Sequence, residues 1–249
     1  MALFTRTRTN PIFYRDRLEL ILRDEPERLE RMRTEPANAD LLTWNVFASL
    51  DSHRDQDWLA YRLQEIGGQN LRAPVRISLF SGRLRAPYLR PSPAYLREIH
   101  RRAGVAHGDD DSVAVFEEPI EVPVRIETPD VLLLVDTGRA RLRSGSSGRD
   151  RIAEVVDCGL EHARRLSSRL SVGIVLDDDS SVLRSEVPQL ATREHLAQRV
   201  PWRERPPRVD VHGTGWSTVL AIWADEAGNL ALGGQPARAF RSYAERATG

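Results

Sequence analysis

Lysine is absent from this sequence, so arginine supplies all 36 of the strongly basic side chains. Cysteine occurs once, as Cys158, which excludes an internal disulfide and any zinc site built from several cysteines. Long apolar runs are also missing: none approaches the roughly 18 residues of a membrane-spanning helix, so we expect no membrane partner. No secretory leader pattern stands near the start, which predicts a cytoplasmic protein.

The chain also lacks net charge, because its 36 acidic side chains cancel its 36 basic ones. A chain without net charge is a poor candidate for coating nucleic acid non-specifically, although a local basic groove remains compatible with it. The 249 residues are 41% hydrophobic and 29% charged. That is enough apolar material for one large domain, with or without an appendage.

The first part of the chain is rich in charge and predicts helices. Residues 12–33 carry apolar side chains at helical spacing and predict one helix, or two short ones broken near Glu25-Pro26. We therefore assign residues 1–36 to an N-terminal helical extension. A more apolar helix follows Asp40, whose side chain is well suited to an N-cap.

The stretch 121–143 predicts a β-hairpin that ends in an acidic residue. Val122, Val124 and Ile126 alternate with other residues, in the period-two pattern of a half-buried strand. A turn at 128–130 leads into a continuously apolar run that is too short for a helix and is typical of a central strand buried on both faces. That second strand would end at Asp136.

The clearest helical pattern follows the hairpin. From Arg149 to Leu170 the apolar residues recur at three- and four-residue steps, and Cys158 falls within that pattern as a buried thiol. Residues 171–176 then predict a strand, which completes a β-α-β crossover. The acidic run 177–179 stands at the carboxyl end of this strand, where turn or capping roles are the simplest interpretation.

This order of elements resembles the PD-(D/E)XK nuclease superfamily, particularly bacterial members in which a strand, an Ile-Glu-Thr-Pro-like turn (here 126–129) and a second strand lead into Glu-Ala-Lys. The phrase 42–47 is similar to the first helix of that group. The resemblance implies an α/β fold with a mixed central sheet, flanking helices and a restriction-endonuclease-like core. It also implies one domain over 1–249, with an insertion at 71–105.

In such enzymes an acid on the first strand and an acid two residues before a lysine hold Mg²⁺ and position a water against a phosphodiester. Hard divalent cations prefer carboxylate oxygens, and the metal offsets the charge that develops on the phosphate. Here the first acidic position falls on Pro123, the second on Asp136 and the lysine on Gly138. Arg139 should point to the opposite face of a continuing strand, and its guanidinium is essentially never deprotonated. We therefore expect a degenerate catalytic site.

Retained activity would require a migrated acid. The catalytic candidates are then Asp136, Glu127 and Glu121, with Glu118 as a further one. The same enzyme would bind Mg²⁺ or Mn²⁺ through Asp136, Glu121 and Asp40, because the resemblance implies that a first-helix acid can join the metal site.

Five arginines, Arg139, Arg141, Arg143, Arg149 and Arg151, cluster around the Ser/Gly linker 144–148, and the first three predict a nucleic-acid-binding loop. Guanidinium groups bind phosphate in a bidentate manner, and such contacts would survive the loss of catalysis. A surface loop with solvated charges explains the same residues equally well.

Three functions remain open at this point. The first is a degenerate nuclease-like protein that acts by binding nucleic acid or a protein partner. The second is an active, divalent-metal-dependent DNA endonuclease with a migrated acidic site. The third is a structural protein-interaction module, which the zero net charge favours.

Overall fold

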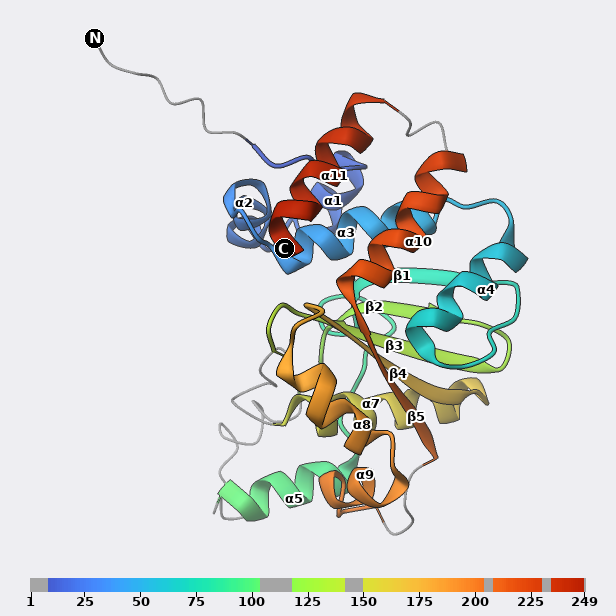
Figure 1. Ribbon diagram of the computed structural model, residues 1–249. Coiled ribbons are helices and arrows are strands. Elements are labelled where there is room, and N and C mark those ends of the chain that lie inside the picture. Colours follow the sequence, from blue (N-terminus) through green and yellow to red (C-terminus); the bar gives the residue numbers. More distant parts are fainter. Residues whose placement is uncertain (1–8, 104–117, 142–149, 204–207, 230–233, 249) are drawn as a thin grey trace.

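A five-stranded mixed sheet lies between two layers of helices in the computed structural model (Figure 1). The structure describes residues 9–103, 118–141, 150–203, 208–229 and 234–248. The strands lie in the sheet in chain order, and they are β1 (Arg76–Ser81), β2 (Val122–Glu127), β3 (Val131–Thr137), β4 (Arg169–Leu176) and β5 (Val209–Gly215). The first three pair antiparallel and the last three pair parallel. The predicted α/β class with a mixed sheet is confirmed.

The predicted hairpin is formed by β2 and β3. Val124 pairs with Val135 and Ile126 pairs with Leu133. Thr128 closes the turn, since its backbone N–H donates to the carbonyl oxygen of Val131 at 3.0 Å. Every residue of β3 is buried, because helices cover both faces of this central strand. Burial on both sides explains why its sequence is continuously apolar instead of alternating.

The helix after the hairpin is α7 (Arg151–Leu166), and it leads into β4 parallel to β3. Asp150 caps its start, because the carboxylate accepts hydrogen bonds from the backbone N–H groups of residues 152 and 153. The helix ends at Ser167, whose φ of 55° is left-handed. The prediction of a helix up to Leu170 was therefore wrong at its end, because Leu170 continues the apolar pattern from within β4. Cys158 is buried, as predicted.

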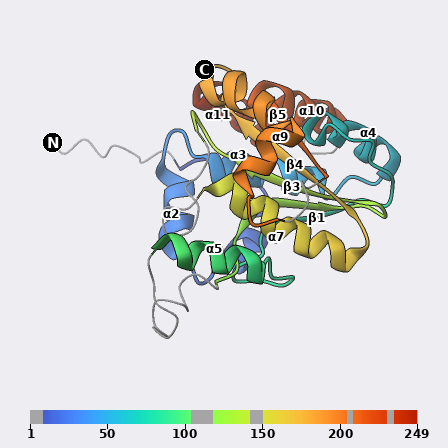
Figure 2. The same cartoon turned by 90° about the horizontal axis from the view of Figure 1, so that it is seen from below.

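The two faces of the sheet carry different helices. On one face lie α3 (Ala39–Leu50), α4 (Gln56–Gly67) and α10 (Trp216–Asn229), and on the other lie α7 and α8 (Val187–Leu190). Figure 2 shows α7 on one side of the sheet and α4 and α10 on the other. The indole rings of Trp44, Trp216 and Trp223 are buried in the first of these layers.

The N-terminal helices are α1 (Arg15–Ile21) and α2 (Pro26–Thr34), so the predicted break near Glu25-Pro26 is confirmed. Leu18 and Met32 are buried in the same core as α3, so this segment packs on the sheet domain. The last helix, α11 (Gln235–Thr248), lies beside them (Figure 1).

Residues 71–105 contain β1, which is an edge strand of the sheet, and α5 (Pro93–Ala103). Between β4 and β5 the chain forms a π-helical turn over Val182–Glu186, then α8 and α9 (Arg193–Arg199). Among the described residues no helix has the length and apolar character needed to cross a bilayer.

Candidate functional site

A buried ion pair stands where the hairpin predicts the catalytic acid. Asp136, near the carboxyl end of β3, is fully buried, and Arg151 at the first position of α7 pairs with both of its carboxylate oxygens. The Nε–Oδ2 distance is 3.0 Å and the Nη2–Oδ1 distance is 3.2 Å. Burial alone would lower the pKa of Arg151, but the charges of Asp136 and Glu154 outweigh it and the pKa is raised. Arg151 therefore stays cationic beside Asp136.

A second buried arginine, Arg28 of α2, contacts two further acids of the predicted metal site, and its Nη1 also lies 3.2 Å from Oε2 of Glu25. Its Nε lies 2.7 Å from Oδ2 of Asp40, and its Nη1 lies 2.9 Å from Oε2 of Glu121. The guanidinium also lies over the ring of Phe80, 4.2 Å from its centroid. Burial opposes its charge, but the neighbouring carboxylates of Asp40 and Glu121 raise the pKa of Arg28. Arg28 is thus a fixed positive charge among three acids.

The two ion pairs meet at Glu121, just before β2. The carboxylate of Glu121 contacts Arg28, and its backbone oxygen accepts a hydrogen bond from Nη2 of Arg151 at 2.7 Å. Asp40, Glu121 and Asp136, the three acids predicted as metal ligands, therefore belong to one connected cluster built from α3, β3 and the start of β2. We call these three acids and two arginines the arginine–carboxylate cluster.

The cluster does not fit a divalent cation. Each of its three carboxylates already lies against a guanidinium, so Mg²⁺ or Mn²⁺ would have to displace a buried arginine. Within the described ranges no group of three or more histidine, cysteine or acidic side chains is arranged to hold a metal ion. The positive charge beside these three acids is provided by arginines of the chain itself.

Glu127 does not join the cluster, so the prediction that it shares a site with Asp136 is not supported. It pairs in the sheet with Leu132, four residues before Asp136, which corresponds to about 13 Å along the strand. Its carboxylate contacts Arg76 and Arg125 instead. Glu118 is also elsewhere, and its exposed carboxylate pairs with an arginine at 3.0 Å.

Pro123 and Gly138, the positions at which the resemblance leads us to expect an acid and a lysine, both lie next to Asp136. Val124 pairs with Val135, so the same register puts Pro123 opposite Asp136. Two residues after Asp136, Gly138 is enclosed: a Cβ added there would lie 2.5 Å from the carbonyl oxygen of Arg141 and 2.9 Å from a methyl group of Leu176. A side chain of any kind, lysine included, has no room at this position.

We expect Gly138→Ala to lower the free energy of unfolding by about 1–3 kcal/mol, the usual cost of forcing atoms into a packed site. Backbone, and not a flexible side-chain end, is the nearest obstacle, so relaxation must move the loop after β3. Urea unfolding of the two proteins measures the difference. An unchanged unfolding midpoint would show that the loop yields freely, and that a Cβ is tolerated at this position.

Of the three arginines predicted to bind nucleic acid, the structure describes two. Arg139 is half-buried, and its Nε donates to both carboxylate oxygens of Asp177, at 2.8 and 3.1 Å. Arg141 is exposed, and with Arg139 and the first turn of α3 it lines a shallow cavity of about 320 Å³. Arg143 lies outside the described residues.

Two capping interpretations have different outcomes. Asp178 accepts hydrogen bonds from the backbone N–H and the hydroxyl of Ser217 at the start of α10, so a capping role is confirmed for this one residue of the 177–179 run. The N-cap of α3, however, is Asn38, whose side chain accepts from the backbone N–H of Leu41 at 2.9 Å. The assignment of Asp40 as this cap was wrong, since its carboxylate faces Arg28.

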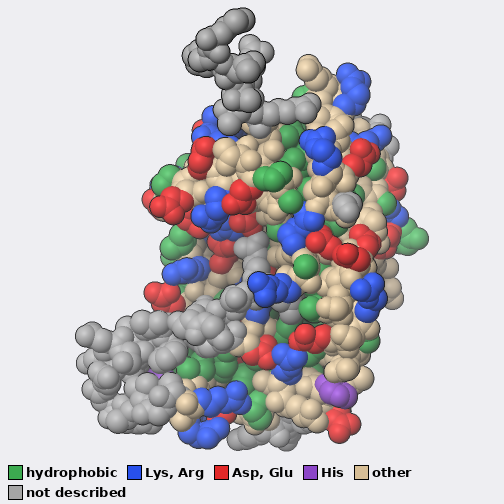
Figure 3. Space-filling model, turned by 60° about the vertical axis from the view of Figure 1, so that its left-hand side comes forward, with side chains coloured by type: hydrophobic (Ala, Val, Ile, Leu, Met, Phe, Trp, Pro, Cys, Tyr) green, Lys and Arg blue, Asp and Glu red, His purple; other side chains and the backbone are tan. Residues whose placement is uncertain are grey.

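Sequence reasoning missed the burial and the ion pairs of both arginines of the cluster. Arg28 sits in a charge-rich helix and gives no local sign of burial. Arg151 does give a local sign, because it is the first residue of a helix. A cation at this end is repelled by the helix dipole, so its presence there indicates that acids lie around it. On the face shown in Figure 3, basic and acidic side chains are interspersed among the described residues, so long-range attraction of a charged ligand is weak.

Comparison of the sequence with protein-family models, with curated proteins and with solved structures found no significant match. The fold and the site therefore define the class of this protein by themselves. It is an α/β protein with a mixed sheet and a buried arginine–carboxylate cluster at the carboxyl end of its central strand.

Proposed function

We propose that this chain is a catalytically degenerate nuclease-like protein that acts by binding a nucleic acid or a protein partner. One observation carries the proposal: Asp40, Glu121 and Asp136 are connected, but Arg28 and Arg151 occupy the positions between them. Such an arrangement keeps the acids of a metal site and replaces the metal by the side chains of two arginines.

The order of elements supports the nuclease-like part of the proposal. A hairpin ending in Asp136 is followed by a helix that packs on the sheet and by a parallel strand, as the resemblance to PD-(D/E)XK nucleases implies. An acid from the preceding α3, Asp40, reaches the same cluster through Arg28. Pro123 lies opposite Asp136, where the superfamily carries its first acid.

The chemistry of the cluster supports the loss of catalysis. Hydrolysis of a phosphodiester by this class needs a metal to stabilise the developing charge and a group that activates water. Arg28 and Arg151 are cations, but both are buried and already paired, and neither can act as a base. Gly138 leaves no space for the missing lysine.

A cleavage assay tests the proposal. Plasmid and single-stranded DNA are incubated with the full chain in Mg²⁺ or Mn²⁺, beside Asp136→Asn and the control Asp179→Asn, which removes an exposed charge at the end of β4. We expect no cleavage above background with any of the three proteins, and no saturable Mn²⁺ binding by titration calorimetry. Cleavage by the wild type and the control, but not by folded Asp136→Asn, would instead establish an active endonuclease.

The kind of partner is decided by a second measurement on the same DNA. If nucleic acid is the partner, a salt-sensitive complex should form, and Arg139→Gln/Arg141→Gln should weaken it. No binding at all would favour a protein partner. A complex that the loss of these two arginines does not weaken would mean that another surface of the chain contacts the DNA.

A further inference from the structure

A cavity of about 660 Å³ lies between α11 and the N-terminal part of the chain. One wall is the exposed side of α11, with Arg238, Ser242 and Arg246. The other wall includes the hydroxyl-bearing Thr9 and Thr34. We call this the α11 cavity. It contains none of the residues of the arginine–carboxylate cluster.

The periodicity of α11 directs its two arginines into the cavity. Arg238, Ser242 and Arg246 are four residues apart and share one face of the helix, while Phe240 and Ala244 are buried in the core on another. Eight residues of helical rise separate the two arginines by about 12 Å along the axis. Long side chains can converge on one ligand across that distance.

The positive charge of the α11 cavity is not neutralised locally. Both arginines are exposed, and neither forms an ion pair with any residue that the structure describes. None of the described residues that line the cavity is acidic. Glu35 is the nearby carboxylate, but it accepts a hydrogen bond from the amide of Asn38 at 2.6 Å and lies 4.0 Å from an arginine of α2.

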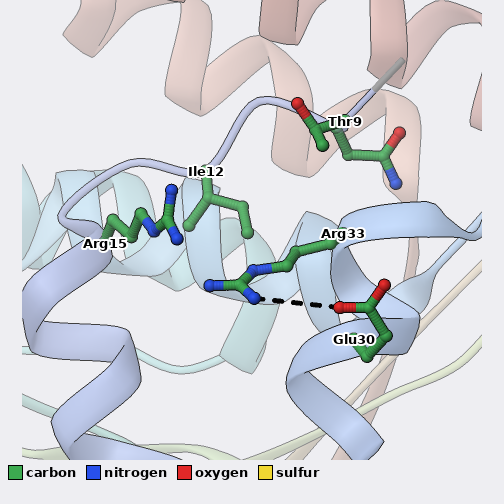
Figure 4. Close-up of a pocket in the computed structure, with 6 residues that line it drawn as sticks. Thr9, Ile12, Arg15, Glu30 and Arg33 are labelled. Carbon is green, nitrogen blue, oxygen red and sulfur yellow. Dashed lines mark ion pairs between the residues drawn. The ribbon is translucent and has the colours of Figure 1, made fainter. Parts of the chain in front are cut away.

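A neighbouring cavity of about 310 Å³ shows the opposite arrangement (Figure 4). It shares Thr9 with the α11 cavity and also contains two arginines, Arg15 and Arg33. Arg33 pairs with Glu30 at 3.7 Å, and both arginines lie 2.7 Å from Glu19. The two arginines of this cavity are therefore neutralised by acids of the chain. Of the two cavities, only the α11 cavity offers guanidinium groups that are free to bind a ligand.

We propose that the α11 cavity binds a phosphate group. Guanidinium groups bind phosphate oxygens in a bidentate manner, and the hydroxyls of Ser242 and Thr9 add neutral donors, whereas the hydroxyl of Thr34 already donates to the carbonyl oxygen of Glu30. The volume falls in the range of small-ligand sites and is sufficient for a nucleotide. The phosphate can come from a free nucleotide or from the backbone of a single strand. This inference goes beyond the proposed function and does not depend on it.

The test uses the full chain and two probes: adenosine 5′-monophosphate by titration calorimetry, and a labelled single-stranded 12-mer by fluorescence anisotropy at low salt. The double variant Arg238→Gln/Arg246→Gln should bind at least about tenfold more weakly than the wild type. For the strand, the slope of log K against log salt should become shallower by about 1.4, or 0.7 for each lost phosphate contact. The matched control is Arg241→Gln, an exposed arginine of the same helix outside the cavity.

The binding results of the two probes distinguish the possible sources of the phosphate. Binding of both probes identifies a nucleotide-type phosphate, and binding of the strand alone identifies a phosphodiester backbone. If neither probe binds, or if Arg241→Gln weakens binding as much as the double variant does, the cavity is not a phosphate site. All three arginines are exposed, so thermal melting should show that each variant is folded.

Discussion

Asp136→Ala is expected to lower the free energy of unfolding by about 3–5 kcal/mol, because it leaves the buried guanidinium of Arg151 without its main counter-charge. Arg151 is 8% exposed in its side chain and Asp136 is fully buried, so water cannot replace the lost carboxylate. Urea unfolding at neutral pH measures the loss. The matched control is Asp130→Ala, which removes an exposed pair with Arg169 and should cost no more than about 1 kcal/mol.

A double variant separates the ion pair from the packing of the two side chains. Asp136→Leu/Arg151→Met removes both charges. We expect its loss of unfolding free energy to be smaller, by at least about 1 kcal/mol, than the sum of the losses of the single variants Asp136→Leu and Arg151→Met. The double variant should still be less stable than the wild type, since Arg151 also contacts the buried Glu154 at 3.4 Å and that contact is lost. Strictly additive losses would mean that the two residues are not coupled as the cluster requires.

Asp157→Ala is expected to have an effect of similar size, about 3–4 kcal/mol, because one carboxylate serves several donors. Its oxygens accept hydrogen bonds from the backbone N–H and hydroxyl of Ser92, at 2.7 and 2.9 Å, and from the indole N–H of Trp202 at 2.9 Å. Arg203 donates to it as well. Asp157 thus ties α7 to the segments next to α5 and after α9.

Asp157→Asn supplies the control for this second prediction. It keeps the shape and one acceptor oxygen but removes the charge, so its loss should lie between zero and that of Asp157→Ala. Urea unfolding compares the three proteins, and hydrogen exchange should show faster opening of α5 in the alanine variant. If Asp157→Ala lowers the free energy of unfolding by less than about 1 kcal/mol, Ser92 and Arg203 must find other partners, and Asp157 is not needed to hold these segments together.

The elements around the site were predictable because each depends on neighbouring residues. Alternation in β2, the apolar run of β3 and the periodicity of α7 are local patterns, and together they put Asp136 at the end of a buried strand. The end of α7 was mispredicted because Leu170 fits the helical and the strand pattern equally well. The resemblance to PD-(D/E)XK nucleases remains an expectation that the cleavage assay addresses.

The sequence by itself therefore determined the strands β2, β3 and β4, the principal helix and the loss of lysine chemistry. Only the tertiary structure decided which charges are buried. Arg28 reaches Glu121 across 93 positions and Ser92 reaches Asp157 across 65, so no local pattern reports either contact. A charged side chain is buried only where the fold brings it a partner, and the same residue would otherwise be solvated. The tertiary fold thus made a cluster of acids and arginines out of side chains that resemble ordinary surface charges.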